Sequence, residues 1–307
     1  MDFEVSRAVA DALARGGPVV ALETAVITHG LAFPENVEIA LAMEEAIRVE
    51  QACPATIGVV KGRIVVGMNS EQIEAFGRAP RDSILKCSRR DLPTAVAAKS
   101  DGALTVAGTI AVADAASIRI LATGGIGGVH RGHPQDVSAD LHELGRTPVV
   151  VVCAGAKSIL DLPATLEVLE SLGVTVVGLG TPTLPAFFAR DSGLALPYSV
   201  ETVEEAADVL CAWKNLDVAA GLLVAVPVAE DRALDSGEAE YAIEQAVRDA
   251  DEYGISGSRL TPYILQRVAE LTKGRSLVAN KALLLNNAGT AAVIARTAKL
   301  GSIHARI

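Results

Sequence analysis

Short runs of apolar residues alternate along the chain with longer segments whose apolar positions recur at helical spacing. The short runs are continuously apolar, which is typical of strands that are covered on both faces. The expected strands are Pro18–Leu22, Thr56–Val60, Arg63–Val66, Ile118–Ala122, Pro148–Cys153, Val174–Gly178 and Gly221–Val226. The expected helices are Glu35–Gln51, Leu92–Lys99, Leu162–Leu172, Val203–Trp213, Glu238–Asp251, Pro262–Lys273 and a long stretch from about Leu277 to Leu300.

This alternation predicts an α/β fold with a mostly parallel central sheet and helices on both faces. Asp91-Leu92-Pro93 and Asp161-Leu162-Pro163 each place a capping carboxylate just before a proline of a first helical turn. No repeat, low-complexity tract or linker divides the chain, so we expect one domain over residues 1–307. In such sheets ligands gather beyond the carboxyl ends of the strands, which makes the polar residues there the candidates for chemistry.

Composition narrows the class of protein. The chain is 50% hydrophobic and 21% charged, enough apolar material for a core and unlike a disordered or fibrous protein. The net charge of −10 argues against a nucleic-acid partner, although a small anionic ligand remains open. The longest apolar run, Val149–Ala156, is far shorter than the roughly 18 residues of a membrane helix, and the acidic start lacks the features of a signal peptide.

Cysteine usage points to the cellular compartment. Four cysteines without C-x-x-C spacing are expected as reduced core thiols, which predicts a cytoplasmic protein; they are Cys53, Cys87, Cys153 and Cys211.

Two ionisable residues end apolar runs. Glu23 follows Val19–Leu22, where a carboxylate is costly to ionise, so we expect a raised pKa and a general acid. A solvated glutamate, or one paired with an arginine, is the alternative. Lys157 closes Val149–Ala156, where desolvation favours the neutral amine that Schiff-base chemistry needs. A lysine that reaches out to water, or caps the next turn, is the alternative.

A glycine-rich segment follows the strand expected at Ile118–Ala122. Four glycines within residues 124–128 permit positive φ and let backbone N–H groups converge on an anion. His130 and Arg131 beside them favour a phosphate, whereas a plain flexible loop is the alternative. The segment matches neither the dinucleotide fingerprint nor a Walker loop.

Asp136 and Ser138 stand two residues apart, so in an extended segment one ligand can meet both. A divalent cation suits the carboxylate and a phosphate suits the hydroxyl. The alternative is that one of the two caps a helix through Leu141 and Leu144.

Two further groups are open to more than one reading. Lys86 belongs to a basic cluster ahead of a helix start, which suits either an oxyanion or ion pairs with Asp91. Asn280 and the pair Asn286-Asn287 interrupt an apolar helix, and because buried amides need partners, a ligand is one option.

These residues belong to longer strings that carry a family resemblance. The strings are Val20-Ala21-Leu22-Glu23-Thr24; His29-Gly30 with Pro34-Glu35-Asn36-Val37; Lys86 with Ser88-Arg89-Arg90-Asp91-Leu92; the segment from Ala122 to Gly132; Asp136-Val137-Ser138-Ala139-Asp140-Leu141; Cys153-Ala154-Gly155-Ala156-Lys157-Ser158-Ile159-Leu160-Asp161; and Leu277-Val278-Ala279-Asn280 with Asn286-Asn287-Ala288. In this order they resemble the pseudouridine-5′-phosphate glycosidases, also called the indigoidine synthase A-like family. The resemblance runs over nearly the whole chain.

The resemblance implies a three-layer α/β/α fold, a homotrimer and reversible cleavage of pseudouridine 5′-phosphate into uracil and ribose 5-phosphate. It implies that Lys157 forms an imine with the opened ribose, that Glu23 is the acid–base residue, and that Asp136 is the site of one Mn²⁺ per subunit. The substrate-binding residues it implies are Lys86, Val106, Thr123, His130, Ser138, Ala139, Asp140 and Asn280. The chemistry is consistent with this set, because a C-glycoside offers no leaving oxygen for two-carboxylate hydrolysis.

The sequence also departs from the family pattern. The altered positions are Gly180–Phe187, which lacks two usual acids, Lys281 beside Asn280, and His133-Pro134-Gln135 before Asp136. Two alternatives therefore stay open. One is a C-glycosynthase that joins ribose 5-phosphate to a larger aromatic aglycone. The other is a non-catalytic sugar-phosphate-binding protein, although the joint presence of Glu23, Lys157 and Asp136 favours catalysis.

Overall fold

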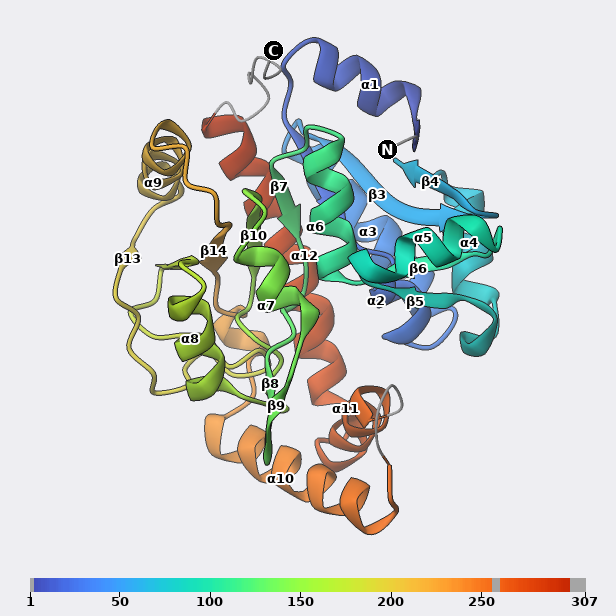
Figure 1. Ribbon diagram of the computed structural model, residues 1–307. Helices are drawn as coiled ribbons and strands as arrows, with labels where there is room; N and C mark the ends of the chain where they lie inside the picture. The colour runs from blue at the N-terminus through green and yellow to red at the C-terminus, as the bar shows by residue number, and fades with distance from the viewer. Residues whose placement is uncertain (1–2, 256–259, 299–307) are drawn as a thin grey trace.

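A long mixed sheet forms the centre of the molecule in the computed structural model, which describes residues 3–255 and 260–298 (Figure 1). Its strands are β1 (Phe3–Val5), β2 (Val19–Leu22), β3 (Cys53–Val60), β4 (Arg63–Val66), β5 (Leu85–Cys87), β6 (Gly102–Leu104), β7 (Ile120–Ala122), β10 (Val150–Cys153), β12 (Thr175–Leu179), β13 (Ser199–Val200) and β14 (Leu222–Ala225). The order is β1-β4-β3-β2-β7-β10-β14-β12-β13, and β6 pairs with β3 and β5. From β3 through β13 every neighbouring pair along this order is parallel, whereas β3 meets β4 and β6 antiparallel.

Helices cover both faces of this sheet. They are α1 (Arg7–Ala14), α2 (Ala25–His29), α3 (Glu35–Val49), α4 (Ser70–Arg78), α5 (Leu92–Ala97), α6 (Val106–Ala115), α7 (Ala139–Leu144), α8 (Leu162–Ser171), α9 (Val203–Asn215), α10 (Ser236–Glu252), α11 (Leu260–Leu271) and α12 (Arg275–Thr297). In Figure 1, α12 passes behind β7 and β10, where it packs on both strands and on α3 and α9, while α6 and α7 lie in front. A small antiparallel sheet of β11 (Leu160–Asp161), β8 (Val129–His130) and β9 (His133–Val137) lies below them.

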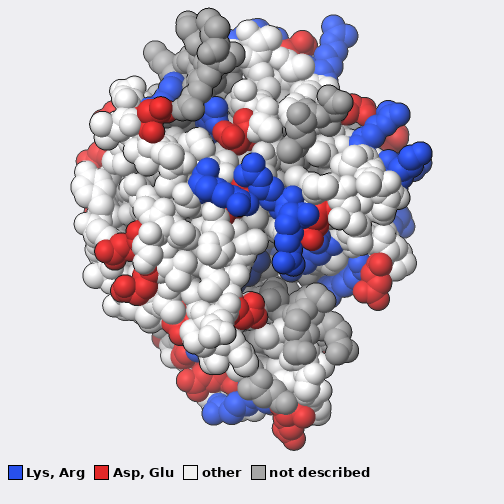
Figure 2. All heavy atoms as spheres, viewed as in Figure 1, with Lys and Arg blue, Asp and Glu red and all other residues white. Residues whose placement is uncertain are grey.

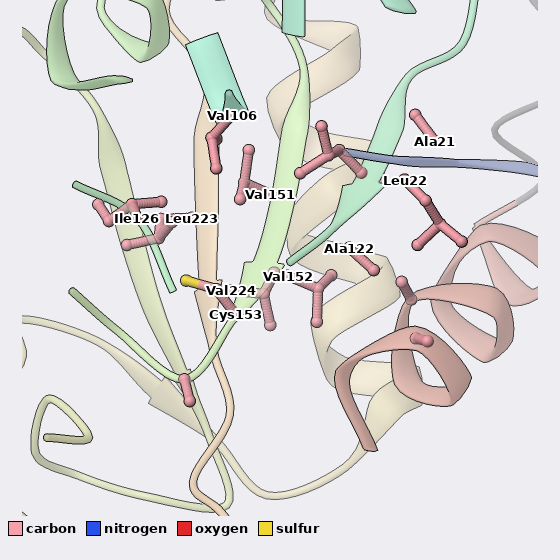
Figure 3. Close-up of a cluster of buried hydrophobic side chains, with 14 of the residues drawn as sticks. Ala21, Leu22, Val106, Ala122, Ile126, Val151, Val152, Cys153, Leu223 and Val224 are labelled. Atoms are coloured by element: carbon pink, nitrogen blue, oxygen red, sulfur yellow. The ribbon is translucent and has the colours of Figure 1, made fainter. Parts of the chain in front are cut away.

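The core lies where the central strands run side by side. Figure 3 shows apolar side chains of β2, β7, β10 and β14 gathered into one cluster, among them Leu22, Ala122, Val151 and Leu223. All four are buried, and burying an aliphatic side chain of the size of valine or leucine contributes about 1.5–3 kcal/mol. This packing holds the carboxyl ends of neighbouring strands at fixed positions.

The structure confirms the predicted α/β/α arrangement and each expected strand and helix within the described residues. The expected end of the last helix at Leu300 lies outside them. Several elements were not predicted, including α6, whose residues Val106–Ala113 are all buried. A helix that is apolar on every side has no amphipathic period to detect.

One described helix, Arg275–Thr297, is long and apolar enough by composition to cross a membrane. It packs against β2, β7, β10, α3 and α9, and its Asn287 side chain donates to backbone carbonyls of the chain after β7. Its apolar residues therefore cover the central sheet.

Candidate active site

A cavity of about 560 Å³ opens at the carboxyl ends of β2, β7 and β10. Its wall contains every site residue that the family resemblance implies, although those residues come from distant segments. They are Glu23, Lys86, Val106, Thr123, His130, Asp136, Ser138, Ala139, Asp140, Lys157 and Asn280. Figure 2 shows Lys and Arg side chains gathered across the middle of the molecule on the face seen in Figure 1.

Glu23 is a buried carboxyl at the end of β2. Burial raises its pKa above the ordinary value, while the nearby Lys157 ammonium and a hydrogen bond from Thr123 oppose the rise. That hydrogen bond runs from Thr123 Oγ1 to Glu23 Oε1. The raised pKa agrees with the prediction from the sequence and suits a carboxyl group that both gives and takes a proton.

Lys157 lies half-buried at the end of the segment 154–157. Backbone hydrogen bonds join this segment to the glycine segment that follows β7. Ala154 N donates to Gly124 O at 2.9 Å, Ile126 N donates to Gly155 O at 3.1 Å, and Lys157 N donates to Ile126 O at 3.0 Å. The backbone turn between Ala154 and Lys157 needs glycine at position 155. Gly155 has φ of +84°, and an added Cβ would lie 2.3 Å from the Pro185 carbonyl oxygen.

Gly155→Ala is therefore expected to lower the free energy of unfolding by about 3 kcal/mol, since left-handed strain and a backbone clash add together. Gly132→Ala is the matched control, because Gly132 has φ of +73° but no atom within 4 Å of an added Cβ. Its expected loss is about 1 kcal/mol. Urea denaturation measures both, and equal losses would contradict the assignment of a clash at Gly155.

The glycine segment itself differs from the prediction. None of its four glycines has positive φ; instead each one lets another group approach closely. A Cβ on Gly127 would lie 2.1 Å from Ser138 Oγ, and one on Gly125 would lie 2.7 Å from the Phe187 ring. The Gly127 N–H donates to Asp140 Oδ2 at 2.8 Å, so this amide binds a carboxylate of the protein itself.

Arg131 is also placed differently from the prediction of a phosphate ligand. Its guanidinium donates to the Leu160 carbonyl at 3.1 Å and the Ser158 carbonyl at 3.0 Å, and it pairs with Glu240 at 2.6 Å. It braces the segment after Lys157 against α10. The neighbouring His130 faces the cavity.

Asp140 joins two walls of the cavity. Its buried carboxylate accepts from Ala107 N, at the start of α6, at 2.8 Å, and from Gly127 N at 2.8 Å. Ser138 caps α7 by accepting from Asp140 N at 3.2 Å, which was the alternative reading of this segment. Asp140 therefore shapes the wall beside Val106 and Ala139, and Ser138 both caps the helix and lines the cavity.

One side of the cavity is basic. Lys86 lines it from β5, and desolvation together with the charge of Lys157 lowers the Lys86 pKa. Arg90 joins it there, whereas Arg89 turns away to pair with Glu143 at 2.7 Å. His29, which the analysis of single residues did not select, also lines the cavity. Burial and the charge of Lys86 lower its pKa to about 4, so it is neutral at physiological pH.

The two expected helix caps have different outcomes. Asp161 Oδ1 accepts from Ala164 N at 3.0 Å and caps α8 as predicted. The Asp91 carboxylate makes no cap on α5; it accepts from Ser88 N at 2.9 Å and from Ser88 Oγ at 2.7 Å. The Asp91 carboxylate also lies 3.5 Å from Arg90. This contact confirms in part the alternative that the basic cluster around Lys86 forms ion pairs with Asp91.

Asp136 offers limited ligation for a metal ion. Its exposed carboxylate lies 3.7 Å from His130 Nδ1, and within residues 3–255 and 260–298 no group of three His, Cys, Asp or Glu side chains could hold a metal ion. One carboxylate fits a hard cation such as Mn²⁺ that keeps water or substrate oxygens as its other ligands. The four cysteines are free thiols.

Residues 8–297 match the family described as indigoidine synthase A like protein. A curated relative from Herpetosiphon aurantiacus, named pseudouridine-5′-phosphate glycosidase, is 52% identical over 286 residues, which cover 92% of this chain and 94% of the relative. The chain belongs to the indigoidine synthase A-like family. A relative of the same name from Caldanaerobacter subterraneus subsp. tengcongensis is 48% identical over 295 residues, 95% of each chain.

Two solved structures have the same fold as this chain. The prealnumycin C-glycosynthase in complex with ribulose 5-phosphate has a TM-score of 0.88 and 37% identity, and the alignment covers 97% of both chains. An indigoidine synthase A-like protein from Thermotoga maritima has a TM-score of 0.87 and 37% identity, over 97% of this chain and 96% of that one.

The positions that depart from the family pattern lie outside the wall of this cavity, apart from Phe187 at the end of the stretch Gly180–Phe187. Lys281 is not among the residues that line the cavity and pairs with Glu35 of α3 at 3.1 Å. Phe187 lines it, packed on Gly124 and Gly125. His133-Pro134-Gln135 line an adjoining cavity of about 790 Å³, which shares His130 and Leu160, among others, with the first.

Proposed function

We propose that this protein reversibly cleaves the C–C glycosidic bond of pseudouridine 5′-phosphate, giving uracil and ribose 5-phosphate. The observation that carries the proposal is one cavity holding an amine, Lys157, and a buried carboxyl of raised pKa, Glu23, beside a basic wall. The names of relatives at 48% and 52% identity support the same reaction.

The amine starts the reaction at the sugar. In the proposed sequence, Lys157 Nζ bonds to the anomeric carbon while the ring C–O bond breaks and its oxygen takes a proton. Glu23 then delivers a proton to the uracil carbon that carries the sugar. The nitrogen lone pair forms the C=N bond as the C–C bond breaks, and the electron pair of that bond stays with the base. Water hydrolyses the imine and releases ribose 5-phosphate.

Other groups of the wall hold the substrate. Lys86 and Arg90 supply charge for the phosphate, and Ser138 supplies a hydroxyl. Asn280, His130 and the neutral His29 offer hydrogen bonds to sugar hydroxyls or the base. Asp136 would hold Mn²⁺, whose charge would stabilise negative charge on substrate oxygens.

A direct assay tests this function. Incubation with pseudouridine 5′-phosphate and Mn²⁺ is expected to release uracil and ribose 5-phosphate in equal amounts, and the two products are expected to recombine. A chelator is expected to reduce the rate if Mn²⁺ at Asp136 takes part. Absence of uracil release with Mn²⁺ present would contradict the proposal.

A C-glycosynthase acting on a larger aromatic aglycone is the second candidate. The adjoining cavity favours it for two reasons. The volume of about 790 Å³ is larger than a pyrimidine needs, and the wall includes the apolar side chains Val247, Ile255 and Ile264. Efficient imine formation with ribose 5-phosphate but weak cleavage of pseudouridine 5′-phosphate would support this reading.

Lys86→Met is expected to raise KM for the phosphorylated substrate about 30-fold, because a hydrogen-bonded charge pair with phosphate contributes about 1.5–3 kcal/mol. Arg89→Met is the control, since Arg89 pairs with Glu143. Steady-state kinetics at fixed ionic strength measure both. Similar KM values for pseudouridine and its 5′-phosphate in the native protein would contradict a phosphate site.

Assembly and location are also proposed. Family resemblance supports a homotrimer, which analytical ultracentrifugation would test, and exposed Leu216 and Val49 are apolar positions that an interface could cover. Four free thiols support a reducing compartment, hence the cytoplasm.

A further inference from the structure

Asn287 is a buried amide on α12 that reaches the chain where it leaves β7. Its Nδ2 donates to the Thr123 carbonyl at 2.9 Å and lies 3.4 Å from the Gly124 carbonyl. The last residue of β7 paired in the sheet is Ala122, so Asn287 supplies a donor beyond the end of the ladder. A buried carbonyl needs such a partner.

Close packing makes this reach possible. A Cβ on Gly124 would lie 3.1 Å from Leu284 and 3.2 Å from Leu283, both on α12. Glycine at this position therefore lets the helix approach the chain closely enough for the Asn287 side chain to bond to it.

Thr123 links Asn287 to the Glu23 carboxyl group through hydrogen bonds. Its N–H donates to the Val152 carbonyl at 3.1 Å, its carbonyl accepts from Asn287, and its hydroxyl donates to Glu23 Oε1. With the backbone held on both sides and the side chain buried, the direction of the hydroxyl is fixed.

We propose that Asn287 is a positioning residue that acts through Thr123 to hold the Glu23 carboxyl at the angle from which a proton reaches the substrate carbon. The proposal rests on the acid–base role of Glu23 proposed above. A carboxyl group that rotates freely loses this alignment, although the amine of Lys157 keeps its own position.

The same contact affects protonation. The Thr123 hydrogen bond, Lys157 and Lys86 all lower the pKa of Glu23, whereas burial and Asp140 raise it. Loss of the hydrogen bond therefore shifts the pKa of Glu23 upward, and the limb of the pH–rate profile that Glu23 sets moves to higher pH.

The test uses matched variants of the full-length protein. Asn287→Asp keeps the shape but replaces the donating NH₂ with an oxygen, while Asn286→Asp makes the same change at an exposed neighbour. Thr123→Val removes the hydroxyl and Thr123→Ser keeps it. Each variant is assayed for cleavage, for its pH–rate profile and for borohydride-trapped adduct with ribose 5-phosphate.

Asn287→Asp and Thr123→Val are expected to lower kcat for cleavage about 30-fold and to move the Glu23 limb to higher pH. Both are expected to trap ribose 5-phosphate within about threefold of the native protein, because trapping needs only the amine. Asn286→Asp is expected to resemble the native protein in all three assays. Thr123→Ser is expected to recover the pH–rate profile that Thr123→Val loses, because it restores the hydroxyl.

Two results would overturn the inference. One is a native kcat in Asn287→Asp. The other is an equal loss of trapping and cleavage with an unchanged pH–rate profile, which would mean that Asn287 contributes only to packing. Asn287→Ser, judged by the same criteria, replaces Asn287→Asp if that variant does not fold. If the native protein itself fails to trap ribose 5-phosphate, the proposed function fails instead.

Discussion

Glu23→Gln is expected to slow cleavage of pseudouridine 5′-phosphate by at least about 100-fold, because general acid–base catalysis typically contributes 10²–10⁴-fold. Glutamine keeps the size and a hydrogen-bond acceptor for the Thr123 hydroxyl, but it has no proton to give to carbon. Imine formation with ribose 5-phosphate is expected to continue.

The pH–rate profile gives a second readout for Glu23. Burial raises its pKa, so the protonated acid persists to higher pH than for an ordinary glutamate before cleavage falls. This limb is expected to be absent in Glu23→Gln. Turnover within a few-fold of the native rate would mean that another group is the acid.

Lys157→Ala is expected to abolish both cleavage and synthesis, with a loss of at least about 10⁴-fold, because Lys157 supplies the amine of the covalent step and Lys86 on the basic wall is assigned to the phosphate. The half-buried side chain makes no ion pair within 4 Å among the described residues. The melting temperature is therefore expected to stay close to the native value. Residual cleavage above that limit in the variant would contradict the nucleophile assignment.

Parts of the fold follow from the sequence because their signals are local. Continuous apolar runs such as Pro148–Cys153 indicate covered strands, and the amphipathic helices show their period. The helix α6 has no such period because it is buried on every side. The short strands β8 and β11, two residues each, pair with each other although they are far apart in the sequence, and they carry no signal of their own.

The candidate site was predictable as a set of residues but not as a geometry. The sequence selected Glu23 and Lys157 because each charged group ends an apolar run. It could not show that Arg131 pairs with Glu240, which lies 109 positions away. Nor could it distinguish glycines that need positive φ from those at residues 124–128, which allow close approach.

The same limit applies to Asn287 and Asn286. Both interrupt the apolar pattern of α12, but only the helix geometry shows that Asn287 is buried against Thr123 and Asn286 is exposed. A polar residue within an apolar helix indicates that a partner exists, and the fold decides which partner it is.

The central claim is that Lys157 forms an imine with the opened sugar. The most direct measurement is to incubate the native protein with ribose 5-phosphate, reduce it with borohydride and map the adduct by peptide mass spectrometry. We expect the mass of one reduced pentose phosphate on the peptide that contains Lys157. An adduct on Lys86 instead, or no adduct on a protein that still releases uracil, would contradict the mechanism.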